Sequence, residues 1–474
     1  MSYKTIVGLE IHVELSTKTK AFCSCENQFG GEPNTRVCPI CLGLPGGIPV
    51  LNKNVVNYTI MAGLALNCNI AKKSKFDRKN YFYPDLTKGF QITQDDMAIC
   101  NEGYIEIETE EGSKKVGIYK IQMEEDTGKS LHTEDNSTLM DYNRCGVPLI
   151  EIVSKPEMNS GKEARLFLEK LKNTLIYIGV SDCKMEEGSL RCDVNVNVVD
   201  EETGKKTAVT EVKNLNSFRG VEKAIDFEVQ RHIALLQNGE NEIRTTRRWD
   251  DANNETVLMR VKYTVADYRF APEGDLPPVI LTDELIEKIK DELPELPQAK
   301  KERFMREYKI PEYDAEVLIS TKELSKYYEE VAKNFDDSIM VSNWIMTEVL
   351  RRVENIDEEF KLPFEPADFV DLLKAVKSGK INNNAGKKVL REMFETSKKP
   401  EDIIKEQGLV QISDTSEIDA LVDKVLSDNP QSIEDFKAGK DRAFGFLVGQ
   451  VMKASKGKAN PQLVNKLLTE KLNK

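Results

Sequence analysis

The sequence lacks the features that would direct the chain into a membrane or onto nucleic acid. It contains no run of about 18 apolar residues, so we expect no transmembrane helix. Its net charge is −13, so no overall positive field attracts DNA or RNA, and any RNA contact must come from a local basic patch. The first residues lead at once into an expected strand, which leaves no room for a signal peptide and predicts a cytoplasmic location.

Two common nucleotide-binding signatures are also missing. Gly128-Lys129-Ser130 resembles the end of a P-loop, but the first glycine of that loop would fall at position 123, which is methionine. No glycine-rich dinucleotide fingerprint occurs either. A sheet face lined with carboxylates remains one way to bind ATP, because such a face can hold the magnesium that bridges to the phosphates.

What the sequence does contain predicts an α+β protein of several domains. At 474 residues the chain is too long for one core and should form about two to four domains. Strand-like segments occur before Pro277-Pro278, whereas helices almost without strands are expected from Thr282 onward. We expect domains over residues 1–292, 293–402 and 403–474, with prolines stiffening the first linker.

Local signals predict individual helices and turns. A helix is expected over about Asn54–Leu66, and a second begins at the capping box Ser160-Gly-Lys-Glu163. A third is expected from about Arg219 to Gln237, before the helix-stop residues Asn238-Gly239. Ile381–Gly386 is expected to form a turn ahead of another helix.

Carboxylates and one histidine lie on the polar faces of several expected strands. Thr5–Leu15 alternates between apolar residues and a face that carries Glu10, His12 and Glu14, which is the period of a half-buried strand. A solvated outer face is the ordinary explanation of such a pattern. A carboxylate inside an apolar strand nevertheless needs a partner or a metal. Further candidates on expected strands are Glu125, Glu151, Asp193 and Glu211, the last beside Lys213.

Four of the nine cysteines have the spacing of a zinc site. Cys23-Ser-Cys25 and Cys38-Pro-Ile-Cys41 form two close pairs on either side of a glycine-containing loop. This pattern predicts a tetrahedral four-thiolate site, with four unrelated reduced cysteines as the alternative. The zinc would be structural, because four thiolates fill its coordination shell. The other five are expected to be packing residues: Cys68, Cys100, Cys145, Cys183 and Cys192.

Three basic segments could contact anions. Arg78 and Lys79 stand beside Tyr81, Phe82 and Tyr83, a mixture that suits stacked bases or phosphates but also an ordinary loop core. An arginine-rich region could bind phosphate or form salt bridges: Arg244, Arg247, Arg248, Arg260 and Arg269. The C-terminal segment is basic and could contact RNA or simply be solvated, with Arg442, Lys453, Lys456, Lys458 and Lys466 among its cations.

Long motifs extend over essentially the whole chain. They are GLEIHVEL, RKNYFYPDL, EEDTGKSLH, DYNRCGVPLIEIVSKPE, GVSDCKMEEGSLRCDVNVNV, EVKNLNSFRGVEKAIDFE, DYRFAPEGDLPP, GLVQISD and GFLVGQVMKASKGKANPQLVNKLL. In sequence and in order these motifs resemble the B subunit of the bacterial glutamyl-/aspartyl-tRNA amidotransferase. No room is left for the extra domain of the archaeal relatives.

The resemblance implies a fold and a ligase reaction. Residues 1–292 would form a cradle domain with a mixed or antiparallel sheet like that of glutamine synthetase, including a zinc knuckle at residues 23–41. A helical domain and a tRNA-binding tail domain would follow. The cradle would use ATP to phosphorylate the side-chain carboxylate of glutamate or aspartate mischarged on tRNA. Ammonia would then displace phosphate and leave Gln-tRNA(Gln) or Asn-tRNA(Asn).

The resemblance also implies roles for residues noted above. Magnesium binding and catalysis would fall to Glu10, His12, Glu125 and Glu151, with Lys79 as a further catalytic residue. ATP and phosphate would be bound by Arg78, Asp193, Glu211 and Lys213. The tail would hold tRNA through Lys453, Lys456 and Lys458.

The source of ammonia must lie outside this chain. The sequence shows no amidase-like arrangement of serine and lysine and no cysteine–histidine pairing typical of a glutaminase. The resemblance therefore implies a heterotrimer in which this chain joins an amidase subunit, which supplies ammonia, and a third, small subunit. Two other interpretations remain open, namely a zinc-containing tRNA-binding protein without catalysis and a free-standing ammonia ligase for small acids.

Overall fold

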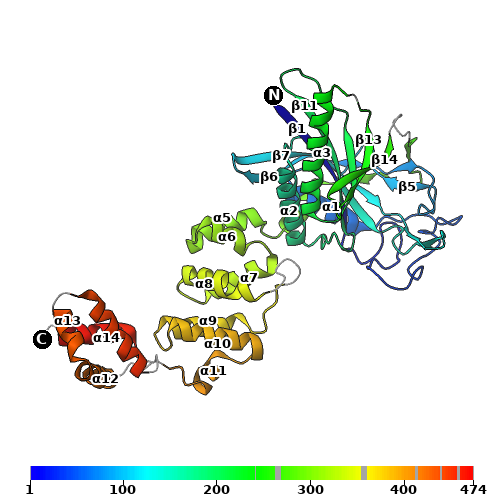
Figure 1. Cartoon of the computed structure of the whole chain (residues 1–474). Helices are drawn as coiled ribbons and strands as arrows, with labels where there is room; N and C mark the ends of the chain where they lie inside the picture. The colour runs from blue at the N-terminus through cyan, green and yellow to red at the C-terminus, as the bar shows by residue number, and fades with distance from the viewer. Residues whose placement is uncertain are drawn as a thin grey trace. The chain divides into compact units, whose positions relative to one another are not determined.

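The computed structural model describes residues 2–240, 242–261, 268–353, 360–410, 415–437, 440–455 and 459–472. The chain divides into two compact units, Met1–Pro297 and Gln298–Lys474 (Figure 1). Within the described residues, no helix has both the length and the apolar character needed to cross a membrane.

A nine-stranded mixed sheet forms the framework of the first unit. Its strands are β1 (Tyr3–Glu14), β2 (Asn69–Ile70), β6 (Cys100–Thr109), β7 (Gly112–Glu125), β10 (Pro148–Ser154), β11 (Leu190–Asp200), β12 (Thr210–Leu215), β13 (Thr245–Asp250) and β14 (Glu255–Val261). They are ordered β14-β13-β12-β11-β1-β10-β7-β6-β2. The β12–β13 pair is parallel, and the other neighbouring pairs of this sheet are antiparallel.

Short strands make three smaller sheets in the same unit. One contains β15, β4 and β5, a second pairs β16 with β3, and a third pairs β8 with β9. Their bounds are β3 (Lys73–Ser74), β4 (Asp77–Asn80), β5 (Phe90–Thr93), β8 (Lys129–His132), β9 (Thr138–Asp141), β15 (Ala271–Pro272) and β16 (Val279–Ile280).

The large sheet buries one face under helices and keeps the other polar. The apolar residues of β1, for example Val7, Leu9 and Ile11, are at most 1% exposed and belong to the main core. Helices α1 (Lys53–Ala65), α2 (Gly161–Ile178) and α3 (Phe218–Asn238) contact this face, and Figure 1 shows α2 and α3 side by side across it. The site residues therefore project from the opposite face.

The predicted helix signals are confirmed in this unit. The Ser160 side chain accepts a hydrogen bond from the Glu163 amide at the start of α2, and Gly179 ends that helix in the left-handed conformation. The capping box is incomplete, because Glu163 accepts from the Asn159 amide rather than from Ser160. Gly239 ends α3 in the same left-handed way. Helix α4 (Asp283–Asp291) packs against the same core through Ile289.

The described part of the second unit contains helices and no strand, which confirms the α+β class with helices following the sheet. Its helices are α5 (Pro297–Tyr308), α6 (Glu312–Leu318), α7 (Lys322–Lys333), α8 (Ser338–Trp344), α9 (Pro366–Lys377), α10 (Asn383–Thr396), α11 (Pro400–Glu406), α12 (Thr415–Asp428), α13 (Pro430–Lys437), α14 (Asp441–Ala454) and α15 (Pro461–Leu472), with a π-helical turn at Ile345–Val349 and a 3-10 turn at Leu350–Arg352.

Two separate cores stabilise these helices. Residues of α5 to α11 enclose one, which includes Phe304, Tyr328 and Phe369, and residues of α12 to α15 enclose the other. The turn expected over Ile381–Gly386 is wrong in its extent. Asn382 caps α10 by accepting from the Ala385 amide, so the helix already begins at Asn383.

Candidate functional site: two acidic clusters and a four-cysteine centre

One histidine and two carboxylates meet on the polar face of the sheet. His12 of β1 lies opposite Glu151 of β10 in the strand register, and Glu124 reaches them from β7. The His12 Nε2 atom lies 3.1 Å from Glu124 Oε1 and 4.0 Å from Glu151 Oε1. One ligand atom of each residue lies within 4.8 Å of the other two, so the first cluster (His12, Glu124, Glu151) could hold a cation.

The pKa values of the first cluster are shifted because its charged groups are buried close together. Burial and the nearby charge of Glu124 raise the pKa of Glu151 to about 7. Burial opposes protonation of His12, but the hydrogen bond and charge of Glu124 raise the pKa of His12 to about 9. His12 lowers the pKa of Glu124 although that carboxylate is fully buried. The cluster thus attracts positive charge strongly, and oxygen and imidazole donors of this kind fit a divalent cation.

A second acidic cluster lies next to the first on the same face. Glu10, two residues before His12 on β1, lies opposite Asp193 of β11, and Glu211 joins them from β12. Their ligand oxygens also lie within 4.8 Å of one another. Lys213 forms an ion pair with Asp193 and places its Nζ 3.3 Å from Glu211 Oε1. The pKa of Lys213 is raised by Asp193 despite burial, so a lysine cation supplies part of the positive charge in this second cluster (Glu10, Asp193, Glu211).

A cavity that is partly open to solvent lies against the cysteine segment, and no member of either acidic cluster lines it. Its lining includes Cys41, Lys88 and Glu125, together with the ion pair of Arg78 and Glu273. Lys88 forms an ion pair with Glu125, whose side chain is almost completely buried. The cavity therefore carries two ion pairs beside a sulfur-rich wall.

Arg78 and Lys79 point to opposite sides of β4, as adjacent strand residues must. The Arg78 guanidinium donates from Nε and Nη2 to Glu273, at 2.8 Å in both cases, on the side of the cavity. The Lys79 Nζ atom lies 4.9 Å from the centre of the Tyr268 ring, and its charge lowers the pKa of Glu124. Lys79 therefore faces the first cluster, whereas Arg78 is held away from it.

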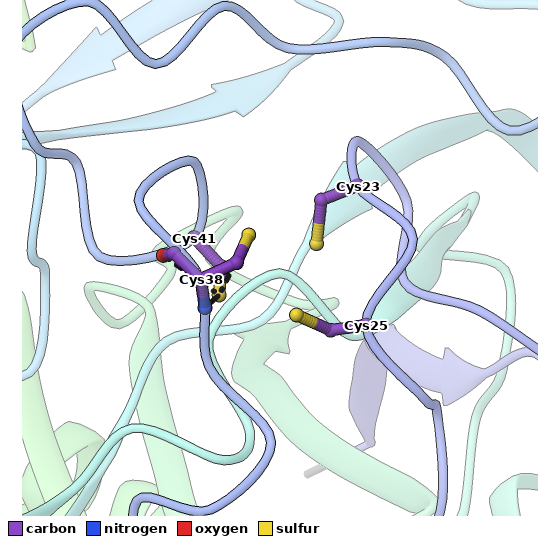
Figure 2. Close-up of side chains that lie close together, drawn as sticks. All are labelled: Cys23, Cys25, Cys38 and Cys41. Carbon is purple, nitrogen blue, oxygen red and sulfur yellow. Dashed lines mark hydrogen bonds between the residues drawn. The ribbon is translucent and has the colours of Figure 1, made fainter.

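The four cysteines of the sequence pattern converge at one point (Figure 2). All four Sγ atoms lie within 4.8 Å of one another, and those of Cys38 and Cys41 are 3.9 Å apart. Zinc bonds of about 2.3 Å in a tetrahedron imply sulfur separations of about 3.8 Å, so the donor set fits that metal. Hydrogen bonds from the Cys23 thiol and the Cys38 amide, with the charge of Lys20, lower the pKa of the Cys41 thiol to about 4.

Comparisons with known proteins agree over the full length of the chain. A family profile described as "GatB/GatE catalytic domain" matches residues 5–287, and one described as "GatB domain" matches residues 326–472. The chain belongs to the GatB family. It is 54% identical, over 100% of both chains, to the B subunit of the aspartyl/glutamyl-tRNA(Asn/Gln) amidotransferase of Clostridium tetani. The proteins of the same name from Clostridium botulinum and Finegoldia magna are also 54% identical over their full lengths.

Within this GatB-family chain, the sequence-predicted residues separate into three places. His12 and Glu151 share the first cluster with Lys79 nearby, whereas Glu10, Asp193, Glu211 and Lys213 form the second. Glu125 does not join either cluster, and the structure corrects the grouping that placed it with His12. Its Oε1 atom accepts a hydrogen bond from the Ile92 amide at 3.1 Å, beside Lys88. The neighbouring Glu124 occupies the position expected of Glu125.

The sequence carried a signal for Glu124 that the choice of Glu125 overlooked. Ile121 and Met123 are fully buried in the core, so the alternation of the strand places Gln122 and Glu124 on the polar face. Glu125 continues the buried side. Three further contacts had no sequence signal. Gln122 donates to Glu151, Thr246 donates to Glu211 at 2.8 Å, and Asn195 donates to Glu10 at 2.9 Å.

Other predictions have simpler outcomes. Arg247 lies 3.3 Å from buried Glu228, so for this residue the salt-bridge alternative is the one observed. Lys453 is exposed in the last turn of α14. Lys456 and Lys458 lie outside the described residues. The five remaining cysteines are buried and free of disulfides, which confirms their role in packing.

Proposed function

We propose that this chain phosphorylates and amidates the side-chain carboxylate of glutamate or aspartate mischarged on tRNA, with ATP as phosphoryl donor. The observation that carries the proposal is the pair of acidic clusters side by side on one sheet face, each with a lysine beside it. Family membership supports the same reaction, because the relatives are named as B subunits of aspartyl/glutamyl-tRNA(Asn/Gln) amidotransferases. The products would be Gln-tRNA(Gln), Asn-tRNA(Asn) or both.

The chemistry explains why both negative and positive groups are needed. A carboxylate is a poor electrophile, and conversion to an acyl phosphate gives ammonia a leaving group. Phosphoryl transfer depends on positioning and on neutralising the charge of the transferred group. Magnesium, when bound, would neutralise and align the ATP phosphates.

The acidic clusters would hold magnesium in this proposal. His12, Glu124 and Glu151 would form one site, and Glu10, Asp193 and Glu211 the other. Lys79, near the Tyr268 ring, and Lys213, beside Glu211, would contact phosphate oxygens. Arg78 forms an ion pair with Glu273, so Arg78 could bind phosphate only if that ion pair opened.

The partners follow from what the chain does not contain. No glutaminase-type residues are evident in its sequence, so ammonia would be supplied by a separate amidase subunit, with a third, small subunit completing a heterotrimer. Zinc would be held by the four cysteines as a structural centre. The tail over residues 403–474 would contact tRNA, with the exposed Lys453 as one contact. A translation enzyme of this kind would act in the cytoplasm.

A pair of adjacent substitutions tests the metal assignment. Glu124 and Glu125 are nearly equally buried, at 2% and 3% exposure, but only Glu124 lies in an acidic cluster. In the complete enzyme, Glu124→Gln should raise the half-saturating magnesium concentration for ATP-dependent amidation about 100-fold or more, since loss of an outer-sphere contact alone costs about 10–100-fold. Glu125→Gln should leave that concentration unchanged, and Glu134→Gln on the exposed β8–β9 hairpin is the neutral control.

The same assay separates the rival functions. A magnesium dependence altered by Glu125→Gln but not by Glu124→Gln would contradict the grouping of these residues. If the wild-type complex binds mischarged tRNA but never amidates it, the protein is a tRNA-binding protein without catalysis. ATP turnover with free glutamate and no tRNA would indicate the small-acid ligase.

A further inference from the structure

Lys20 is a completely buried lysine next to the cysteine centre. Its side chain is 0% exposed, whereas lysines in proteins almost always extend their ammonium group to water. Burying such a charge is unfavourable unless it is compensated by a partner. Among the described residues, its ammonium makes no ion pair with a carboxylate, so the compensating negative charge must come from elsewhere.

The contacts of Lys20 lead to the second cysteine pair. Its Nζ atom donates to the Arg36 carbonyl at 2.8 Å and lies 3.7 Å from Cys41 Sγ. The backbone of Lys20 is tied to the first pair, because its amide donates to the Cys25 carbonyl at 3.0 Å. Lys20 therefore spans both halves of the cysteine centre from a position that water does not reach.

Cys41 is the sulfur that this arrangement favours as a negative ligand. The Cys38 amide donates to its Sγ atom at 3.1 Å, in addition to the contact with the Lys20 ammonium. Four thiolates around one zinc ion carry a net charge of about −2, and a buried centre of that charge needs a nearby cation. Lys20 lies where such a cation would be most effective.

We propose that Lys20 is the internal counter-cation of the four-cysteine metal centre and raises its affinity for zinc. This rests on the proposed zinc occupancy but not on the amidation reaction. Lys20 does not ligate the metal, and it acts by stabilising the negative charge that the bound centre places on Cys41. In this respect Lys20 resembles the outer-shell groups that hydrogen-bond to metal ligands and raise the affinity for the metal.

The test compares zinc affinity in two lysine variants of one segment. Lys20→Met retains a side chain of similar length and removes the charge, and Lys18→Met does the same at an exposed position two residues away. In the full-length protein, competition with a chromogenic chelator should show zinc bound about 10–100-fold more weakly by Lys20→Met, with Lys18→Met unchanged. Lys20→Arg, which keeps the charge, should retain most of the affinity.

Thermal unfolding with and without zinc separates this role from a purely structural one. The centre carries more negative charge with zinc, about −2, than with the single Cys41 thiolate of the metal-free protein. Lys20→Met should therefore lower the Tm of the zinc-bound protein more than the Tm of the metal-free protein. An equal loss of Tm in both states, or an unchanged zinc affinity, would overturn the proposal. Failure of the folded wild-type protein to bind zinc would overturn it as well, whatever the outcome of the amidation assay.

Discussion

A buried ion network behind the second acidic cluster offers a quantitative test of the structure. Glu228 of α3 is 0% exposed and contacts Arg231, His232 and Arg247 at 2.8, 3.2 and 3.3 Å. Burial alone would raise the pKa of Glu228, but hydrogen bonds from His232 and Arg231 outweigh it and lower the pKa to about 2. The network links α3 to β13, which pairs with the strand that carries Glu211.

The magnitude follows from the displacement of this pKa. The lowering from the ordinary value of 4.5 to about 2, at about 1.4 kcal/mol per pKa unit, corresponds to about 3 kcal/mol of folding stability at pH 7. Because the folded-state pKa is depressed, this stability is present above the unfolded pKa and is lost as the pH falls through the folded pKa. At pH 3.5 about 2 kcal/mol should remain. Glu228→Gln should therefore destabilise the first unit by these amounts at the two pH values.

The chain contains its own reporter for this experiment. Of its two tryptophans, Trp249 is buried in β13 and Trp344 lies in the second unit, so a Trp344→Phe background restricts the fluorescence signal to the first unit. Urea unfolding at pH 7 and at pH 3.5 then gives the difference in stability between this background and the same chain carrying Glu228→Gln. A destabilisation below about 0.5 kcal/mol at pH 7, or one that grows as the pH falls, would refute the reasoning.

Two further outcomes are expected. Removal of metal by a strong chelator should expose residues 23–50 to proteolysis, with mass spectrometry locating the cleavage sites. It should also weaken the Lys88–Glu125 contact, because the neighbouring Thr87 donates to the Cys41 carbonyl at 2.9 Å. Cleavage that occurs first elsewhere in the chain would contradict this prediction. Gly63→Ala should destabilise the first unit by about 1–3 kcal/mol in urea unfolding, since its new Cβ would lie 2.4 Å from Cys100 Sγ. Gly112→Ala is the control, because its new Cβ meets open space and the substitution reports only backbone strain. Equal and small losses of stability in the two variants would disprove the packing argument.

Much of the fold could be predicted from local sequence because its signals are local. The alternation over Thr5–Leu15 predicted β1, the cap at Ser160 predicted the start of α2, and Gly239 predicted the end of α3. These signals depend on strand periodicity and on backbone hydrogen bonds within a few residues. The turn expected at Ile381–Gly386 failed because asparagine favours both turns and helix caps.

The site could be predicted only in part, because a cluster depends on contacts between distant strands. The sequence identified nearly all of the acidic residues, but it could not group them. The register of β1 with β10 and β11 decides that His12 meets Glu151 while Glu10 meets Asp193. A one-residue change of register would turn every side chain to the other face, so such pairings are fixed by packing of the whole sheet.

The sequence by itself determined the family, the class of fold, the polar strand faces and the cysteine pattern, since each is written in residue types and spacings along the chain. Only the tertiary structure decided that Glu124 meets His12, that Arg78 and Lys79 contact different groups, and that Lys20 is buried against Cys41. The physical reason is that each of these contacts forms between groups that are buried next to one another. Such burial results from the packing of the whole sheet and its loops rather than from any one segment.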